Sequence, residues 1–200
     1  MHFIPITLAL ARMFIGLVLG APTNVTVDDY GADPTSKYGI SYQPGDRWNI
    51  GQTCTGCEAQ PDPSQAYGGT WHDATFDPSY SNRNTPQTAV FDFTGQSLLS
   101  LSESFYVDRF FIGTALYVFG IQSHSTTEPV SGADLTFWID GVQKNTYAYT
   151  PTQTDDSYTY NKLLFAIEGL EDASHAFTFQ NGQTGGPISL VLFDYLIYTK

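Results

Sequence analysis

Short strand-like runs follow one another along almost the whole chain, and they constrain its fold more than any other feature. Beyond the first 20 residues there is hardly any helical periodicity, whereas runs of strand character bounded by turn residues recur. The runs are 24–28, 38–42, 69–76, 88–93, 114–122, 135–139, 142–147, 160–167, 176–180 and 188–198. About nine or ten short strands without helices predict an all-β fold, an antiparallel β-sandwich of the jelly-roll type.

Two places along this pattern are more specific. Asp140-Gly141 separates runs 135–139 and 142–147, and Asp-Gly is typical of a type I′ turn, in which both central residues take positive φ. The last run, 188–198, is apolar on both faces. We therefore expect it to be a central strand that is covered on each side.

Composition excludes several classes of partner. Aromatic residues make up 15% of the chain and charged residues only 14%, the reverse of a disordered chain. The net charge is −12, and binding along a phosphate backbone or to an anionic lipid surface requires the opposite sign. We expect one folded domain that binds neither nucleic acid nor anionic membranes.

The amino terminus predicts secretion. Residues 1–20 are apolar apart from His2 and Arg12, and the stretch after Arg12 has the length of a signal-peptide core and ends in small residues. We expect cleavage after Gly20, with an uncleaved signal anchor as the alternative, and a single domain over 21–200. After cleavage, no second stretch approaches the length of a membrane span. Asn24-Val25-Thr26 is a glycosylation sequon, which suits an extracellular protein.

Cys54 and Cys57 are the only cysteines and form a C-x-x-C pair. Their flanks are loop-like, whereas a thioredoxin-like redox motif begins a helix after a buried strand. One such pair cannot supply the four ligands of a zinc site. We therefore predict a small local disulfide, which stabilises the fold by only about 2 kcal/mol because the loop is so short.

Residues 96–113 interrupt an otherwise continuous pattern. Joining Gly95 directly to Thr114 gives the run FTGTALYVFG, two strand halves that meet at a glycine. The length of this segment would keep the reading frame if it were an intron. The codons at its two ends can contain the GT and TAG sequences that open and end an intron. We interpret 96–113 as a retained intron or gene-model artefact, with a genuine loop insertion as the alternative.

Three segments carry a resemblance to a known family. They are residues 54–75 (CTGCEAQPDPSQAYGGTWHDAT), the joined run FTGTALYVFG and residues 192–199 (LFDYLIYT). Together they resemble a large, mostly uncharacterised family of secreted or membrane-anchored proteins of mushroom-forming fungi. The resemblance implies a galactose-binding-domain-like jelly roll and an extracellular location, but no known activity.

Two places are candidate ligand-binding sites. Sugars offer C–H patches to aromatic faces and hydroxyls to carboxylates and amides. Trp138 is expected to point away from the core, opposite Gln143 and beside Thr136 and Asn145. The alternative is that a loop or the second sheet covers it.

The second candidate is Trp71 with the adjacent His72 and Asp73, the alternative being a core tryptophan that anchors the disulfide loop. Trp48 and His175 are expected to be structural. Asp194, inside the apolar last strand, is expected to have a charged or hydroxyl partner.

Metal and enzyme signatures are scarce. Asp28, Asp29 and Asp33 permit a structural calcium site without a diagnostic spacing, and no other cofactor is expected. No serine-hydrolase, zinc-protease or P-loop motif is present in the sequence. The sequence therefore predicts a non-enzymatic, lectin-like module that binds a glycan or cell-wall polysaccharide at the fungal cell surface or in extracellular polysaccharide. The alternatives are a structural or adhesive surface protein and, less favoured, a glycoside hydrolase.

Overall fold

The computed structural model describes residues 22–91, 111–126, 131–152 and 157–200. Within them the chain forms eleven strands and four single-turn 3₁₀ helices. The strands are β1 (Asn24–Asp28), β2 (Ile40–Gln43), β3 (Asn49–Ile50), β4 (His72–Phe76), β5 (Gln87–Phe91), β6 (Phe111–Ser123), β7 (Ala133–Ile139), β8 (Val142–Tyr149), β9 (Tyr158–His175), β10 (Phe177–Asn181) and β11 (Ser189–Thr199). The 3₁₀ helices are η1 (Gly45–Arg47), η2 (Gly51–Thr53), η3 (Pro63–Gln65) and η4 (Tyr67–Gly69).

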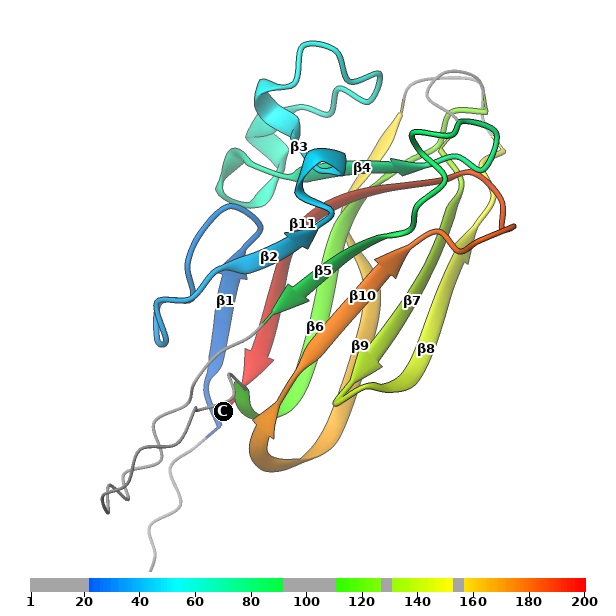
Figure 1. Cartoon of the computed structure of the whole chain (residues 1–200). Helices are drawn as coiled ribbons and strands as arrows, with labels where there is room; N and C mark the ends of the chain where they lie inside the picture. The colour runs from blue at the N-terminus through cyan, green and yellow to red at the C-terminus, as the bar shows by residue number, and fades with distance from the viewer. Residues whose placement is uncertain (1–21, 92–110, 127–130, 153–156) are drawn as a thin grey trace, which may run out of the picture.

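Two antiparallel sheets pack face to face as a sandwich (Figure 1). The first has the order β3-β4-β11-β6-β9, with β1 also paired to β11. The second has the order β2-β5-β10-β7-β8. The prediction of an all-β antiparallel sandwich is confirmed, with eleven described strands where about nine or ten were expected.

Strand β11 is the centre of the six-stranded sheet. Its first half pairs with β4, its second half pairs with β1, and β6 runs along its other edge. All its residues from Ser189 to Leu196 are buried, as expected for a strand covered on both faces. A β-bulge between Phe193 and Tyr195 changes its register on β6 at Asp194.

Side chains of β11 belong to two separate cores. Val191, Phe193 and Leu196 face the second sheet and join the main core between the sheets. Leu190 and Leu192 face outward and pack with Trp71 and Ala59 in a smaller core. Part of the loop of residues 44–71, which lies beside β3 and β4 in Figure 1, therefore covers the outer face of the six-stranded sheet.

The predicted hairpin is present. Asp140 and Gly141 both take positive φ, 54° and 72°, between β7 and β8. One detail of its register differs from the prediction, because a bulge between Phe137 and Trp138 places one extra residue in β8. Trp138 still pairs with Gln143, but Thr136 pairs with Thr146 in place of Asn145.

The predicted disulfide is confirmed: Cys54 and Cys57 are bonded. Strand β3 and the 3₁₀ turns were not predicted, because segments of two or three residues carry no periodic signal. In the described part of the chain, no helix is long and apolar enough to cross a membrane.

Two predictions fall largely outside the described residues. The signal peptide, 1–20, is one of them. Of segment 96–113, only 111–113 are described, and they extend β6 by pairing with 173–175 of β9. The retained-intron interpretation stays a prediction.

A glycine substitution tests how the loop of residues 44–71 packs around Trp71. A methyl group added at Gly51 would lie 1.9 Å from Nε1 of Trp71, which is fixed in the smaller core, whereas one added at Gly56 meets nothing within 4 Å. We expect Gly51→Ala to lower the free energy of unfolding by about 1–3 kcal/mol, the usual cost of overpacking. Chemical denaturation measures this, and Gly56→Ala is the matched control. Equal stability of the two variants would contradict the contact.

Candidate functional site

The outer surface of the five-stranded sheet carries Trp138. Along β5, β7 and β10, alternate side chains such as Ala89, Phe137 and Phe179 are buried between the sheets, so their neighbours point outward. The outward residues of the five strands form two rows across the sheet. We call this surface the Trp138 face; its rows are Ser41, Val90, Thr178, Trp138 and Gln143, and Gln43, Thr88, Gln180, Thr136 and Thr146.

The Trp138 face contains no charged side chain among these ten residues, although the chain has a net charge of −12. Eight of the ten carry hydroxyl or amide groups, which both donate and accept hydrogen bonds. Trp138 is partly exposed in one row, between Thr178 and the exposed Gln143. The face therefore offers one aromatic surface within a field of neutral hydrogen-bonding groups, which suits an uncharged, hydroxyl-rich ligand.

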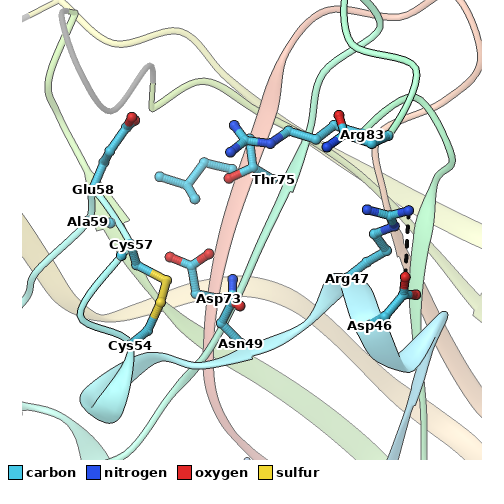
Figure 2. A pocket seen from close by; sticks show the side chains of 13 residues that line it. Asp46, Arg47, Asn49, Cys54, Cys57, Glu58, Ala59, Asp73, Thr75 and Arg83 are labelled. Carbon is cyan, nitrogen blue, oxygen red and sulfur yellow. Dashed lines mark ion pairs between the residues drawn. A yellow bond between two sulfur atoms is a disulfide. The ribbon is translucent and has the colours of Figure 1, made fainter.

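A second candidate site is a pocket beside the disulfide, at the edge of the six-stranded sheet (Figure 2). Its volume is about 370 Å³, within the range of small-ligand sites. We call it the Asp73 pocket; its polar lining includes Asp46, Arg47, Asn49, Glu58, Asp73 and Arg83, together with Cys54 and Cys57.

Asp73 is the buried acid of this pocket, with only 4% of its surface exposed. Burial raises its pKa to about 6, because a carboxylate loses hydration there. A hydrogen bond with Asn49 and the charge of Arg83 act in the opposite direction, and the charge of Glu58 adds to the increase. Arg47 is paired with Asp46 at 3.5 Å, the ion pair drawn in Figure 2. Asp73 can thus hold or release a proton in mildly acidic solution.

His72 does not share this pocket. Successive strand residues point to opposite faces, so Asp73 faces the pocket and His72 faces the interior. Nδ1 of His72 lies 2.6 Å from Oδ2 of Asp29, and the ring stacks on Tyr42 with 3.9 Å between centroids. His72 is therefore a packed and hydrogen-bonded interior residue.

Asp28, Asp29, Thr70, His72 and Asp194 form a carboxylate cluster where β1, β4 and β11 meet. The hydroxyl oxygen of Thr70 lies 2.6 Å from Asp29 and 3.1 Å from Asp28. A hydroxyl has one proton to donate, so the second contact is best satisfied by a proton on a carboxyl. Burial and then the charge of Asp29 raise the pKa of Asp28 to about 6, which agrees with a proton held there.

Asp194 is the fully buried member of the carboxylate cluster. Its Oδ1 accepts a hydrogen bond from the backbone N–H of Tyr67 at 3.0 Å, and its Oδ2 has no hydrogen-bond partner among the described residues. Burial raises its pKa to about 7, and the charges of Asp29 and Asp28 add to this effect. A charged or hydroxyl neighbour was expected for Asp194; the structure gives it a backbone amide as hydrogen-bond donor, with Asp28 and Asp29 as charged neighbours.

The three acids that permitted a calcium site do not gather in one place. Asp33 accepts hydrogen bonds from Thr35, Ser36 and Tyr198, at the turn that follows β1, and it lies outside the carboxylate cluster. Within the described ranges, no group of three or more His, Cys, Asp or Glu side chains could hold a metal ion.

The predicted ligand-binding residues fall in two places. Trp138 and Gln143 lie side by side on the Trp138 face, as expected. Trp71 is only 1% exposed and His72 8% exposed, so neither offers a surface to a ligand, and their proposed role as a platform is corrected. Trp71 is a core residue beneath Gly51, and of this group only Asp73 lines a pocket.

The remaining predicted positions are also placed. Trp48 lies in the main core, as expected. His175 is buried at the end of β9, where its Nδ1 lies 2.8 Å from Oδ2 of Asp140 beside the hairpin turn. Asn24 is exposed at the start of β1.

Sequence reasoning missed the other polar residues of the Asp73 pocket. Arg47 and Asn49 belong to one segment and Arg83 to the β4–β5 loop, and both segments lie beside Asp73 only because β3 pairs with β4 and the loop lines the same pocket. The weak signal available was the rarity of basic residues, since the chain holds only 8 Lys and Arg and the pocket takes two of them.

Comparisons with known proteins assign no family to the chain. No family model and no curated protein matches the chain. Several solved structures are similar to it, including the following three. One is a cycloisomaltooligosaccharide glucanotransferase of Paenibacillus sp. complexed with cycloisomaltoheptaose, at 10% identity over 74% of this chain and 17% of that chain, TM-score 0.40. Two are variants of the catalytic domain of a GH87 alpha-1,3-glucanase in complex with tetrasaccharides, each at 10% identity over 88% of this chain, covering 28% and 27% of those chains with TM-scores of 0.42 and 0.41.

These findings correct one expectation. The prediction that the chain is not an enzyme is contradicted, because several of the similar solved structures are catalytic domains of a GH87 alpha-1,3-glucanase. At such TM-scores the similarity also assigns no activity to this chain. The chain spans between 17% and 28% of the length of those chains.

The buried carboxyls predict stability that falls as pH rises. The folded pKa of Asp194 is about 7 and its ordinary value is 3.8, so the folded state binds the proton more tightly. This contribution is fully present below about pH 4 and is lost as pH rises through about 7. Asp194→Asn mimics the protonated side chain. We expect it to be more stable than the parent by about 1–2 kcal/mol at pH 8 and not at pH 4, a value reduced for partial screening by water.

Urea denaturation at both pH values measures this difference. Asp172→Asn, which removes an exposed carboxylate, is the matched control. A parent whose stability rises between pH 4 and 8 would contradict the assignment of protons to these buried carboxyls.

Proposed function

We propose that the chain is a carbohydrate-binding module and that an extended, neutral polysaccharide lies across its Trp138 face. The observation that carries this proposal is the partly exposed Trp138 within two rows of uncharged hydroxyl and amide side chains. A pyranose ring packs its C–H face on an aromatic ring, and its hydroxyls exchange hydrogen bonds with amides and hydroxyls. A face made by five strands is long enough to contact several sugar units in succession.

The charge distribution favours a neutral polymer over an acidic one. A ligand on the Trp138 face meets no formal charge among its ten residues, and the chain as a whole repels anions. An acidic polysaccharide would lose hydration and gain no ion pair there.

We further propose that the module acts outside the cell, on fungal cell-wall or other extracellular polysaccharide. The disulfide suits an oxidising compartment. The apolar amino terminus, the Asn24 sequon and the resemblance to secreted fungal proteins support the same location.

Substitution of Trp138 tests the proposal. We expect Trp138→Ala to weaken binding to a neutral polysaccharide at least fivefold, a loss of about 1 kcal/mol of stacking. Gln143→Ala, which removes one amide, is expected to weaken it about twofold to fivefold. Co-sedimentation with insoluble β-glucan, chitin and cellulose, followed by titration with soluble fragments, measures both.

Tyr80→Ala is the matched control, because Tyr80 is 59% exposed but lies in the β4–β5 loop, outside the Trp138 face. Binding that survives Trp138→Ala and is lost in Tyr80→Ala would place the ligand elsewhere. A folded parent that binds no neutral polysaccharide would favour the adhesive surface protein. Release of soluble sugar from any of the polymers would identify a hydrolase.

A further inference from the structure

The disulfide of the Asp73 pocket lies in a loop that is anchored without it. The side-chain amide of Gln60 donates to the carbonyl oxygens of Cys54 and Cys57, at 3.0 and 2.6 Å. The backbone N–H groups of Gln60 and Asp62 donate to the hydroxyls of Tyr158 and Tyr160 on β9, at 2.9 and 2.6 Å. These hydrogen bonds do not depend on the sulfur–sulfur bond.

Apolar contacts with the six-stranded sheet also anchor the same loop. Ala59, two residues after Cys57, is buried in the smaller core with Trp71. On the other side of the disulfide, the backbone N–H of Gly51 donates to the carbonyl of Trp71 at 2.8 Å. The two cysteines are only three positions apart, so opening the bond frees little chain entropy. The loop is therefore expected to keep its place when the bond is open.

The disulfide is accessible from the pocket. Cys54 and Cys57 are both partly exposed, and both line the same cavity as the carboxyl of Asp73 (Figure 2). Thiol–disulfide exchange needs such access and a group that supplies and removes protons. Among the charged residues of the pocket lining, Asp73 is the buried one, whereas Arg47 is paired with Asp46.

We infer that Cys54–Cys57 is an exchangeable disulfide, which accepts two electrons from an external dithiol while the domain stays folded, with Asp73 as the group that carries the proton. A thiolate of the dithiol attacks one cysteine sulfur, the Cys54–Cys57 bond breaks, and its electron pair leaves on the other sulfur. That sulfur takes the proton of the Asp73 carboxyl. The Asp73 carboxylate then removes the proton of the second thiol, which attacks the mixed disulfide.

The second attack expels the first cysteine as a thiolate, which is protonated from solvent, and the reagent departs as a disulfide. The two cysteines are reduced and the dithiol is oxidised, so electrons and protons balance. The chemistry differs from that of a helical C-x-x-C, because here the cysteines share a pocket with a buried acid and do not begin a helix.

The first experiment measures reduction of the full chain in dithiothreitol under native conditions. Free thiols are trapped by alkylation and counted by intact mass, while circular dichroism follows the fold. We expect two alkylated cysteines with an unchanged β-sheet spectrum. Reduction that appears only together with loss of that spectrum would identify a purely structural bond and overturn the inference.

The second experiment assigns the proton to Asp73 through a pH profile. The groups that face Asp73 in the pocket are Asn49, Glu58, Asp46, Arg47 and Arg83. At each pH, the reduction rate of the parent is divided by that of the variant, which removes the effect of the reagent's own ionisation from the comparison. For Asp73→Asn we expect a ratio of about ten or more at pH 5 that falls towards one by pH 8, because the carboxyl loses its proton near pH 6.

Asp172→Asn is the matched control, since it removes an exposed carboxylate that does not line the pocket. We expect its ratio to stay constant across the pH range. A constant ratio for Asp73→Asn, or a pH-dependent ratio for Asp172→Asn alone, would overturn the role of Asp73. Neither assay contains a glycan, so their failure would leave the proposal for the Trp138 face intact.

Discussion

The burial of β11 on both faces is the constraint on which the rest of the structure depends. A strand with apolar side chains on each side must be covered twice, once by the second sheet and once by something else. Here the second cover is the loop of residues 44–71, seated by Trp71 and Ala59. That requirement brings the disulfide, its anchoring glutamine and the acid of β4 to one edge of the sheet.

The same constraint explains the carboxylate cluster. Asp194 lies inside β11, where the bulge after Phe193 turns it towards the ends of β1 and β4. A fully buried carboxyl is tolerable there because a backbone amide meets one oxygen and a bound proton removes the charge. The carboxylate cluster thus lies in the six-stranded sheet, whereas the ten residues of the Trp138 face, on the other sheet, carry no formal charge.

The two proposed sites are separated by the sandwich itself. The Trp138 face belongs to one sheet and the Asp73 pocket to the edge of the other. Their chemistry differs in the same way: uncharged hydroxyls, amides and one indole on the first, and acids, arginines and a disulfide on the second. A ligand on the outer face of one sheet leaves the pocket open to solvent, so the two functions can operate independently.

The sequence by itself determined the strands other than β3, the hairpin turn and the outward direction of Trp138. These follow from alternation and from a turn dipeptide, which act over a few neighbouring residues. It also identified β11 as doubly covered and Cys54 and Cys57 as bonded. Only the tertiary structure decided what covers β11, that Trp71 and His72 are interior residues, and that Asp73 shares a pocket with two arginines and the disulfide. Those facts depend on contacts between segments far apart in the chain, which no local pattern specifies.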